Sequence, residues 1–384
     1  MIAYNKDWLD ALLTKDAAQK WHQKGLLSDE KWQAIQDQHP SNFYSPNLFV
    51  RIGLAMFTLI LLSSAAGLVA LFVEPDSELA FSIFSLFWGL VCIFVLERMV
   101  IQPGRHYGSG IDDMLLYVAI GALLTGLCFS LDYSTPSLVY YIIACPFLVL
   151  GSFRYLDRLL ALAAFICSMA IVLLVVKEIP RLALYLLPFS GMLFSGAVYI
   201  FAKQAQTQYT QRHWHGILTV LELLSLIIFY ASGNYWVVQQ AAESYFQLEL
   251  VPMAWFFWAF TILVPFIYIF QGLRRKDRLI LDVGLVCIAA AVFSFRFYFH
   301  VMPLSWATVI AGVVLFATAY FSIRYLNQHE GKYTYDLDAE TSILQEIQQQ
   351  LIEQTIVNQP GVTPGQKGGF GGGQFGGGGA GADF

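Results

Sequence analysis

The sequence predicts an all-α fold, a polytopic membrane helix bundle of about ten transmembrane helices in five hairpins. Three observations predict it. The chain is 57% hydrophobic and only 13% charged over 384 residues, which is too apolar for an ordinary soluble domain. Its apolar residues form runs long enough to cross a hydrocarbon layer of ~30 Å at ~1.5 Å per residue. Its basic residues, finally, fall almost entirely on one side of the membrane when the runs are threaded through it in turn.

The apolar runs divide the middle of the chain into candidate membrane spans. They begin near residues 48, 79, 112, 137, 157, 181, 216, 251, 279 and 303. The fourth run, Ser137 to Phe153, is the shortest, so a full span and a tilted, partial or re-entrant segment both stay open for it. We expect about ten spans, with about nine as the alternative.

The basic residues determine the expected orientation. One side of the membrane collects Lys6, Lys15, Lys20, Lys24, Lys31, Arg51, Arg98, Arg105, Arg154, Arg158, Lys203, Arg212, Arg274, Arg275, Lys276, Arg278, Arg324 and Lys332. The other side carries Lys177, Arg181 and Arg296. Positive residues that flank membrane helices are retained on the cytoplasmic side. We therefore expect a multi-pass protein of the cell inner (plasma) membrane, with both the N-terminus and the C-terminus in the cytoplasm.

Four segments follow from the changes in composition along the chain. We expect a cytoplasmic two-helix leader over residues 1–46, a transmembrane bundle over 47–325, a cytoplasmic amphipathic helix over 326–360 and a Gly-rich disordered tail over 361–384. The leader has no apolar core ahead of a cleavage site, so we do not expect a removable signal peptide. Its second helix should begin at Ser28 and end at Pro40. A leader this small can hardly fold alone, so it should pack on cytoplasmic loops or on another subunit.

The segment after the last span has the pattern of a partner-binding helix. Apolar residues recur along one helical face, at Ile343, Leu344, Ile347, Leu351 and Ile352. Its charged residues are acidic, which anionic lipid headgroups would repel. A protein partner at residues 336–357 or at the leader is therefore favoured over the lipid surface, and a homo-oligomer stays open. The tail beyond residue 361 is too rich in glycine to bury a core.

Composition and motifs exclude several functional classes. A net charge of -5 without a basic stripe gives no basis for binding nucleic acid. The five cysteines lie in apolar runs without the spacing of metal ligands. The signature motifs of metalloproteases, serine hydrolases and nucleotide-binding enzymes are also missing. We therefore expect no enzymatic activity, no metal and no cofactor, with the lipid bilayer as the one certain partner.

Two stretches resemble a known family. They are "WHQKGLLSDEKWQAI" near the amino end and "DRLILDVGLVCIAAAVFSFRFYF" from Asp277 onward. Together they resemble an uncharacterised family of bacterial predicted multi-pass membrane proteins, a domain of unknown function with a short cytoplasmic helical leader. The resemblance covers roughly residues 5 to 325 and leaves out the glycine-rich tail. It implies an architecture only, because the family offers no catalytic or binding residue to carry over.

Two segments also resemble each other. The stretch "LDRLLALAAFICSMAIV" from Leu156 aligns with "KDRLILDVGLVCIAAAV" from Lys276. Matched positions include Asp157 with Asp277, and the cysteines Cys167 and Cys287. Apolar segments resemble one another by composition, so chance similarity and a true internal repeat both stay open; parallel repeats are typical of transporters.

Three ionisable residues inside the spans are candidates for binding a substrate or a proton. Asp282 lies four residues after Arg278, which is within pairing reach on the same helix face. Arg296 lies among aromatic residues near the outer end of its span, where it could equally extend to lipid headgroups. An ionisable group near the centre of a span costs roughly 2.5 to 3.5 kcal/mol. Each such residue therefore needs a compensating partner.

Glu222 is the most informative of the three. It lies within "LTVLELLSLIIF", and its own helix offers no cation three or four residues away. Its partner must therefore come from elsewhere, and Asp282, Arg51 or a water-filled vestibule lie at a suitable depth. A proton-binding carboxylate, a hydrogen bond between helices and a misjudged helix boundary are the alternatives.

Three prolines within the spans complete the set of candidates. Pro146, Pro188 and Pro265 each remove a backbone hydrogen bond and are expected to bend their helices. Such bends make room for cavities in transporters but also occur in inert bundles. The sequence thus predicts a small-solute or proton-coupled carrier built around Glu222. The alternative is a non-catalytic membrane scaffold that recruits partners through its cytoplasmic ends.

Overall fold

The structure is a computed structural model. It describes residues 2–23, 26–103, 105–131, 135–179, 183–247 and 251–299, together with isolated positions between 309 and 324. These residues all belong to the compact unit Met1–Ile343, and a second unit comprises Leu344–Phe384. The predicted tenth span, the amphipathic helix at 336–357 and the Gly-rich tail lie outside the described residues.

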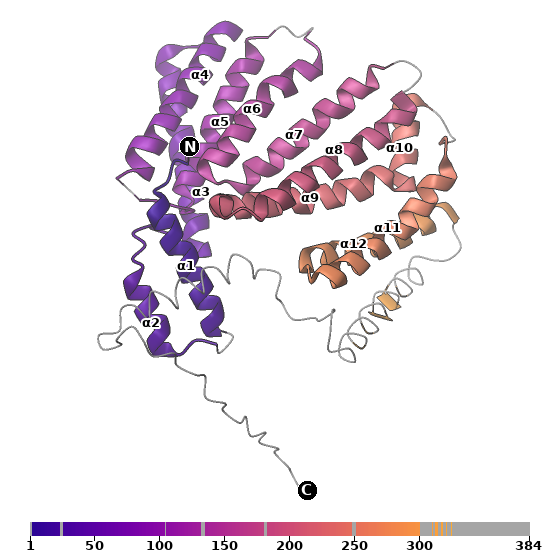
Figure 1. The fold of residues 1–384 in the computed structure, drawn as a ribbon. Helices are drawn as coiled ribbons and strands as arrows, with labels where there is room; N and C mark the ends of the chain where they lie inside the picture. The colour runs from indigo at the N-terminus through magenta and orange to yellow at the C-terminus, as the bar shows by residue number, and fades with distance from the viewer. Residues whose placement is uncertain are drawn as a thin grey trace, which may run out of the picture. The chain divides into compact units, whose positions relative to one another are not determined.

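The described part of the chain is almost entirely helical (Figure 1). The elements are α1 (Lys6–Gln23), α2 (Asp29–Gln38), α3 (Leu48–Val73), α4 (Glu78–Val95), the π-helical segment η1 (Leu96–Ile101), α5 (Ile111–Phe129), α6 (Ser137–Tyr155), α7 (Arg158–Lys177), α8 (Ala183–Gln206), the 3-10 segment η2 (Tyr209–Trp214), α9 (His215–Gly233), α10 (Tyr235–Phe246), α11 (Ala254–Arg275) and α12 (Arg278–Phe299).

Nine helices among the described residues are long and apolar enough to cross a membrane. They are α3 to α9, α11 and α12, with α4 extended by η1 and α9 by the end of η2. The chain is therefore a multi-pass membrane protein with an all-α bundle. The fourth run forms one continuous helix of 19 residues, α6, which is long enough for a full span. The sequence did not predict α10, a helix of 12 residues between two spans.

Large apolar side chains cover the outward surfaces of these helices. On α3, Phe49 is 86% exposed and Phe72 is 83% exposed. Exposed aliphatic and aromatic residues of this kind also occur along α4, α8 and α11. In water such a surface would drive aggregation, whereas in lipid it carries no cost. The bundle is thus built to contact the hydrocarbon of a bilayer.

Neighbouring helices pack as hairpins, and the most extensive contact is between α4 and α5, which lie side by side (Figure 1). Small residues let the two backbones approach each other. The Ser82 hydroxyl donates a hydrogen bond of 2.6 Å to the Gly126 carbonyl oxygen. A Cβ atom on Gly126 would lie 2.8 Å from the Ser82 carbonyl oxygen. Glycine is therefore required at this crossing, as is common between membrane helices.

The two segments that resemble each other in sequence adopt the same turn. Leu156 (φ 56°) and Lys276 (φ 57°) are both left-handed and end the preceding helices α6 and α11. The aspartate that follows then caps the next helix. Asp157 accepts a hydrogen bond from the Leu160 backbone N–H at 2.7 Å, and Asp277 accepts one from the Leu279 N–H at 3.1 Å. The likeness thus extends to local geometry, while common ancestry of the two segments stays a prediction.

The three predicted kink residues lie within helices. Pro146 lies in α6, Pro188 in α8 and Pro265 in α11. Each therefore interrupts the backbone hydrogen bonding of a membrane-spanning helix. The bends themselves stay a prediction.

Gly126→Ala should lower stability, because the added methyl group overlaps the backbone of α4. Overpacking of this kind costs typically about 1 to 3 kcal/mol. The matched control is Gly121→Ala on the same helix, where a Cβ meets nothing within 4 Å. Thermal unfolding in detergent should show a lower Tm for Gly126→Ala and an unchanged or higher Tm for Gly121→Ala. Equal Tm values for the two variants would contradict the close crossing.

Candidate functional site

The candidate site is centred on Lys203, near the end of α8. Its Nζ atom lies 2.6 Å from Glu222 Oε1 of α9 and 2.6 Å from Asp277 Oδ2 in the turn between α11 and α12. One ammonium group thus contacts two carboxylates from two other parts of the bundle. We call these three residues the Lys203 triad.

Glu222 is the most deeply buried member of the triad. The residue is only 2% exposed, whereas the Lys203 side chain is 30% exposed. Gln206, almost one turn after Lys203, donates its Nε2–H to Glu222 Oε2 at 3.0 Å. One turn before Lys203, the buried Tyr199 hydroxyl has no hydrogen-bond partner. The Glu222 carboxylate therefore faces α8, where its contacts come from an ammonium and an amide.

The charge balance of the triad determines what it can do. With both carboxyl groups ionised, it holds two negative charges and one positive charge. Burying charge is costly unless each group is paired, and a single ammonium cannot neutralise two carboxylates. The Lys203 ammonium is therefore shared between the two carboxylates, and a change at any one of the three side chains alters the contacts of the other two.

The partners expected for Glu222 from depth alone lie elsewhere. Arg51 pairs instead with Asp113, at 2.6 Å between Nη2 and Oδ2. The Asp282 side chain is 59% exposed, and its Oδ2 atom lies 3.5 Å from the Arg278 Nε atom. Arg278 is the partner that the spacing of four residues predicts. Lys203 was grouped in the sequence with the basic residues flanking the spans. Its long side chain extends from the end of α8 to Glu222. The sequence contains no pattern from which this contact could have been predicted.

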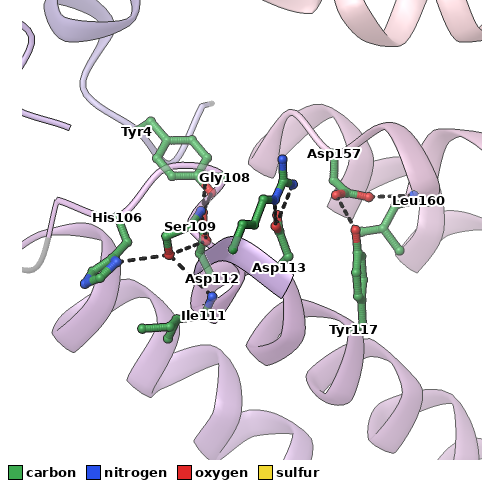
Figure 2. A network of polar contacts seen from close by, with 11 residues as sticks. Tyr4, His106, Gly108, Ser109, Ile111, Asp112, Asp113, Tyr117, Asp157 and Leu160 are labelled. Atoms are coloured by element: carbon green, nitrogen blue, oxygen red, sulfur yellow. Dashed lines mark hydrogen bonds and ion pairs between the residues drawn. The ribbon is translucent and has the colours of Figure 1, made fainter. Parts of the chain in front are cut away.

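A second polar cluster lies around Asp112, in the first turn of α5 (Figure 2). Its carboxylate accepts hydrogen bonds from the Gly108 N–H at 2.7 Å, the Ser109 N–H at 2.9 Å and the Ser109 hydroxyl at 3.0 Å. The Tyr4 hydroxyl adds a fourth bond of 3.3 Å from the amino-terminal segment. Burial, reinforced by the Asp112 charge, raises the pKa of Tyr4 well above its ordinary value, so the phenol stays a donor.

Asp113 and Asp157 extend this network across three helices (Figure 2). Arg51 of α3 pairs with Asp113 of α5. One turn further along α5, the Tyr117 hydroxyl donates to Asp157 Oδ2 at 2.8 Å, at the start of α7. These side chains hold α3, α5 and α7 together at one end of the bundle. Each of the three carboxylates in this cluster has a partner, so the cluster serves to fix the structure of this end of the bundle.

The amino-terminal leader is attached to the same end of the bundle. The Ala3 N–H donates to the Arg154 carbonyl oxygen of α6 at 2.9 Å. Asp10 of α1 forms an ion pair with Arg212, and its Oδ1 atom lies 3.4 Å from His213 Nε2. Of the two alternatives for the leader, packing on the loops of its own bundle is the one observed.

Aromatic side chains complete the attachment of the leader. Tyr4 and Phe43 pack on Tyr107 with ring centroids 4.9 Å and 5.2 Å away. The Arg105 guanidinium lies 5.1 Å from the centre of the Trp8 ring. By contrast, α2 buries no residue, although it begins after Ser28 as predicted. The first helix of the leader thus packs on the bundle. The second contacts α1 through His22, whose Nε2 atom lies 2.6 Å from Asp29 Oδ1 and whose ring stacks on Trp32.

Neither a family model nor a curated protein nor a solved structure matches the chain. The nine membrane-spanning helices in the described ranges support a multi-pass membrane protein of the kind that the quoted stretches resemble. The resemblance itself rests on those stretches alone. Function must therefore be argued from the residues.

Asp10→Asn should loosen the leader, because it removes the charge that faces Arg212 and His213. A partly exposed ion pair is worth at most about 1 kcal/mol. Trypsin should therefore cleave after Lys15 and Lys20 a few-fold faster in limited proteolysis of the variant in detergent. Asp7→Asn is the matched control, since Asp7 is exposed on the same helix. If the two variants are cleaved at the same rate, the Asp10 contact does not hold the leader in place.

Proposed function

We propose that the protein is a proton-coupled carrier of small solutes in which Glu222 exchanges the proton. The observation that carries the proposal is the burial of Glu222 beside an ammonium group that it shares with Asp277. Ionisable residues inside membrane bundles are costly and mark ion or proton pathways in transport proteins.

Protonation of Glu222 would couple to helix packing. In the ionised state Lys203 bridges α8, α9 and the turn before α12. A neutral Glu222 keeps a hydrogen bond to Gln206 but loses most of its attraction to Lys203, which then pairs with Asp277 alone. The link between α9 and the turn before α12 is weakened, so protonation shifts the population between two packings of the bundle.

The orientation and the class of the protein form part of the proposal. The end of the bundle that carries the Lys203 triad and the leader is also the end rich in Lys and Arg. Positive flanks are retained in the cytoplasm, so this end faces the cytoplasm of a bacterial inner membrane and both termini lie inside. The protein acts without enzymatic chemistry and without a cofactor.

A membrane scaffold is the second candidate function. The observation that favours it is the exposure of α2, which buries no residue and follows the 73% exposed Leu26. Under this alternative the bundle is the anchor, and α2 or residues 336–357 recruit a protein partner. Removal of residues 1–40 would then abolish the cellular role, while Glu222→Gln would leave it intact.

Glu222→Gln should abolish proton coupling, because the amide keeps the size and hydrogen bonding of the side chain but cannot take up a proton at neutral pH. Purified protein in liposomes with an internal pH-sensitive dye is tested against a panel of amino acids, organic acids, sugars and inorganic ions. Solute-dependent proton flux should fall at least about tenfold, equivalent to about 1.4 kcal/mol. Asp282→Asn is the control, since Asp282 is exposed and outside the triad.

Two results would contradict the carrier. One is wild-type protein that moves neither protons nor any solute of the panel. The other is solute-driven proton flux that Glu222→Gln leaves unchanged. The first result, combined with a cellular defect on removal of residues 1–40, would favour the scaffold.

A further inference from the structure

Arg296 lies at the opposite end of α12 from the Lys203 triad. It is about 28 Å from Asp277 along the helix axis at ~1.5 Å per residue. Its Nε atom is buried and has no hydrogen-bond partner. Within the described part of the chain, no carboxylate pairs with its guanidinium. A buried N–H group without an acceptor is uncommon, because it has been taken from water without a replacement partner.

A second unsatisfied donor lies on the same stretch of α12. The indole Nε1–H of Trp236, in the first turn of α10, is buried and has no acceptor. The Trp236 ring packs edge-on against Phe293 and Phe297, with centroids 5.7 Å and 6.0 Å away. Phe293 and Phe297 lie three residues before and one residue after Arg296 in α12. Trp236 therefore packs on the turn of α12 that carries Arg296.

Buried hydrogen bonds join the helices beside these donors. Asn234, which is 3% exposed, caps α10 by accepting a hydrogen bond from the Trp236 N–H at 3.0 Å. The same Asn234 oxygen accepts a bond of 3.1 Å from the Ser294 hydroxyl of α12. The Thr261 hydroxyl oxygen of α11 accepts a hydrogen bond of 2.9 Å from the Tyr235 backbone N–H. Buried polar contacts thus hold the start of α10 against α11 and α12, and a rigid frame of this kind keeps binding groups in place.

The acidic residue of α10 has other partners. Glu243 accepts hydrogen bonds from the side-chain amides of Gln239 at 2.9 Å and Gln240 at 3.3 Å. Among the described residues, Glu243 forms no ion pair with Arg296. The N–H donors without an acceptor on this side of the bundle are those of Arg296 and Trp236.

We propose that Arg296 and Trp236 form a binding site for a phosphate group. A guanidinium presents its N–H donors in a planar fork that fits the oxygens of a phosphate, and the indole N–H supplies one further donor. Phe293 and Phe297, which are 49% and 46% exposed, form an apolar border beside these donors. The phosphate belongs either to a lipid headgroup or to a free solute. The site is independent of the proton chemistry proposed for Glu222.

The test uses the full-length protein, purified in a phosphate-free detergent and stripped of lipid. Inorganic phosphate and short-chain phosphatidylglycerol are titrated separately, and binding is followed by thermal shift and by native mass spectrometry. Binding of inorganic phosphate would identify a solute site. Saturable binding of phosphatidylglycerol alone would identify a headgroup site. Either result supports the proposal, and binding of neither probe would overturn it.

Two substitutions separate the contributions of the donors. Arg296→Gln should weaken binding of the active probe at least about tenfold, and Arg296→Lys should retain part of it, since the charge remains while the planar fork is lost. Trp236→Phe keeps the ring packing and removes only the N–H, so it should weaken binding a few-fold. Trp255→Phe is its control, because Trp255 is 73% exposed at the start of α11.

Unchanged affinity in both Arg296→Gln and Trp236→Phe would overturn the site. If Arg296→Gln fails to fold, Trp236→Phe decides the question by itself. In that case, an affinity equal to that of Trp255→Phe would overturn the proposal.

Discussion

The Lys203 ammonium, held between two carboxylates, is the constraint on which the rest of the bundle depends. It joins α8, α9 and the turn between α11 and α12, so three separate parts of the chain meet at one side chain. In lipid the hydrophobic effect does not drive helices together, and polar contacts and close packing must do so. Breaking a buried ion pair leaves an uncompensated charge and costs roughly 3 to 5 kcal/mol. The buried Glu222 of α9 is therefore stabilised by its ion pair with Lys203 of α8.

The two halves of the bundle use the same turn in different ways. Asp157 and Asp277 both follow a left-handed residue and both cap the next helix. Asp157 accepts its remaining hydrogen bond from a neutral phenol, Tyr117, whereas Asp277 faces the Lys203 ammonium. In the first half, the leader is attached through Asp112 and its neighbours, and neutral donors satisfy Asp112 and Asp157. In the second half, an ammonium group is shared between Glu222 and Asp277.

The sequence predicted the spans well, because membrane thickness requires a minimum run length and hydrocarbon excludes unpaired backbone. It missed α10, whose segment "YWVVQQAAESYF" is too short and too polar to be recognised as a span. The partner of Glu222 could not be predicted, because residue position fixes depth along a helix but not its rotation about the axis. Arg51 lies at a suitable depth in the membrane but pairs with Asp113. Lys203 contacts Glu222 from the end of another helix.

The most direct test of the account is a double-mutant cycle between Lys203 and Glu222, with unfolding free energies measured in mixed detergent micelles. Lys203→Met, Glu222→Gln and the double variant are compared with the wild-type protein. The account predicts a coupling energy of about 1 kcal/mol or more, since contacting residues in one network couple by about 0.5 to 3 kcal/mol. Effects of the two substitutions that add to within about 0.5 kcal/mol would show that the two side chains do not interact, and would contradict the account.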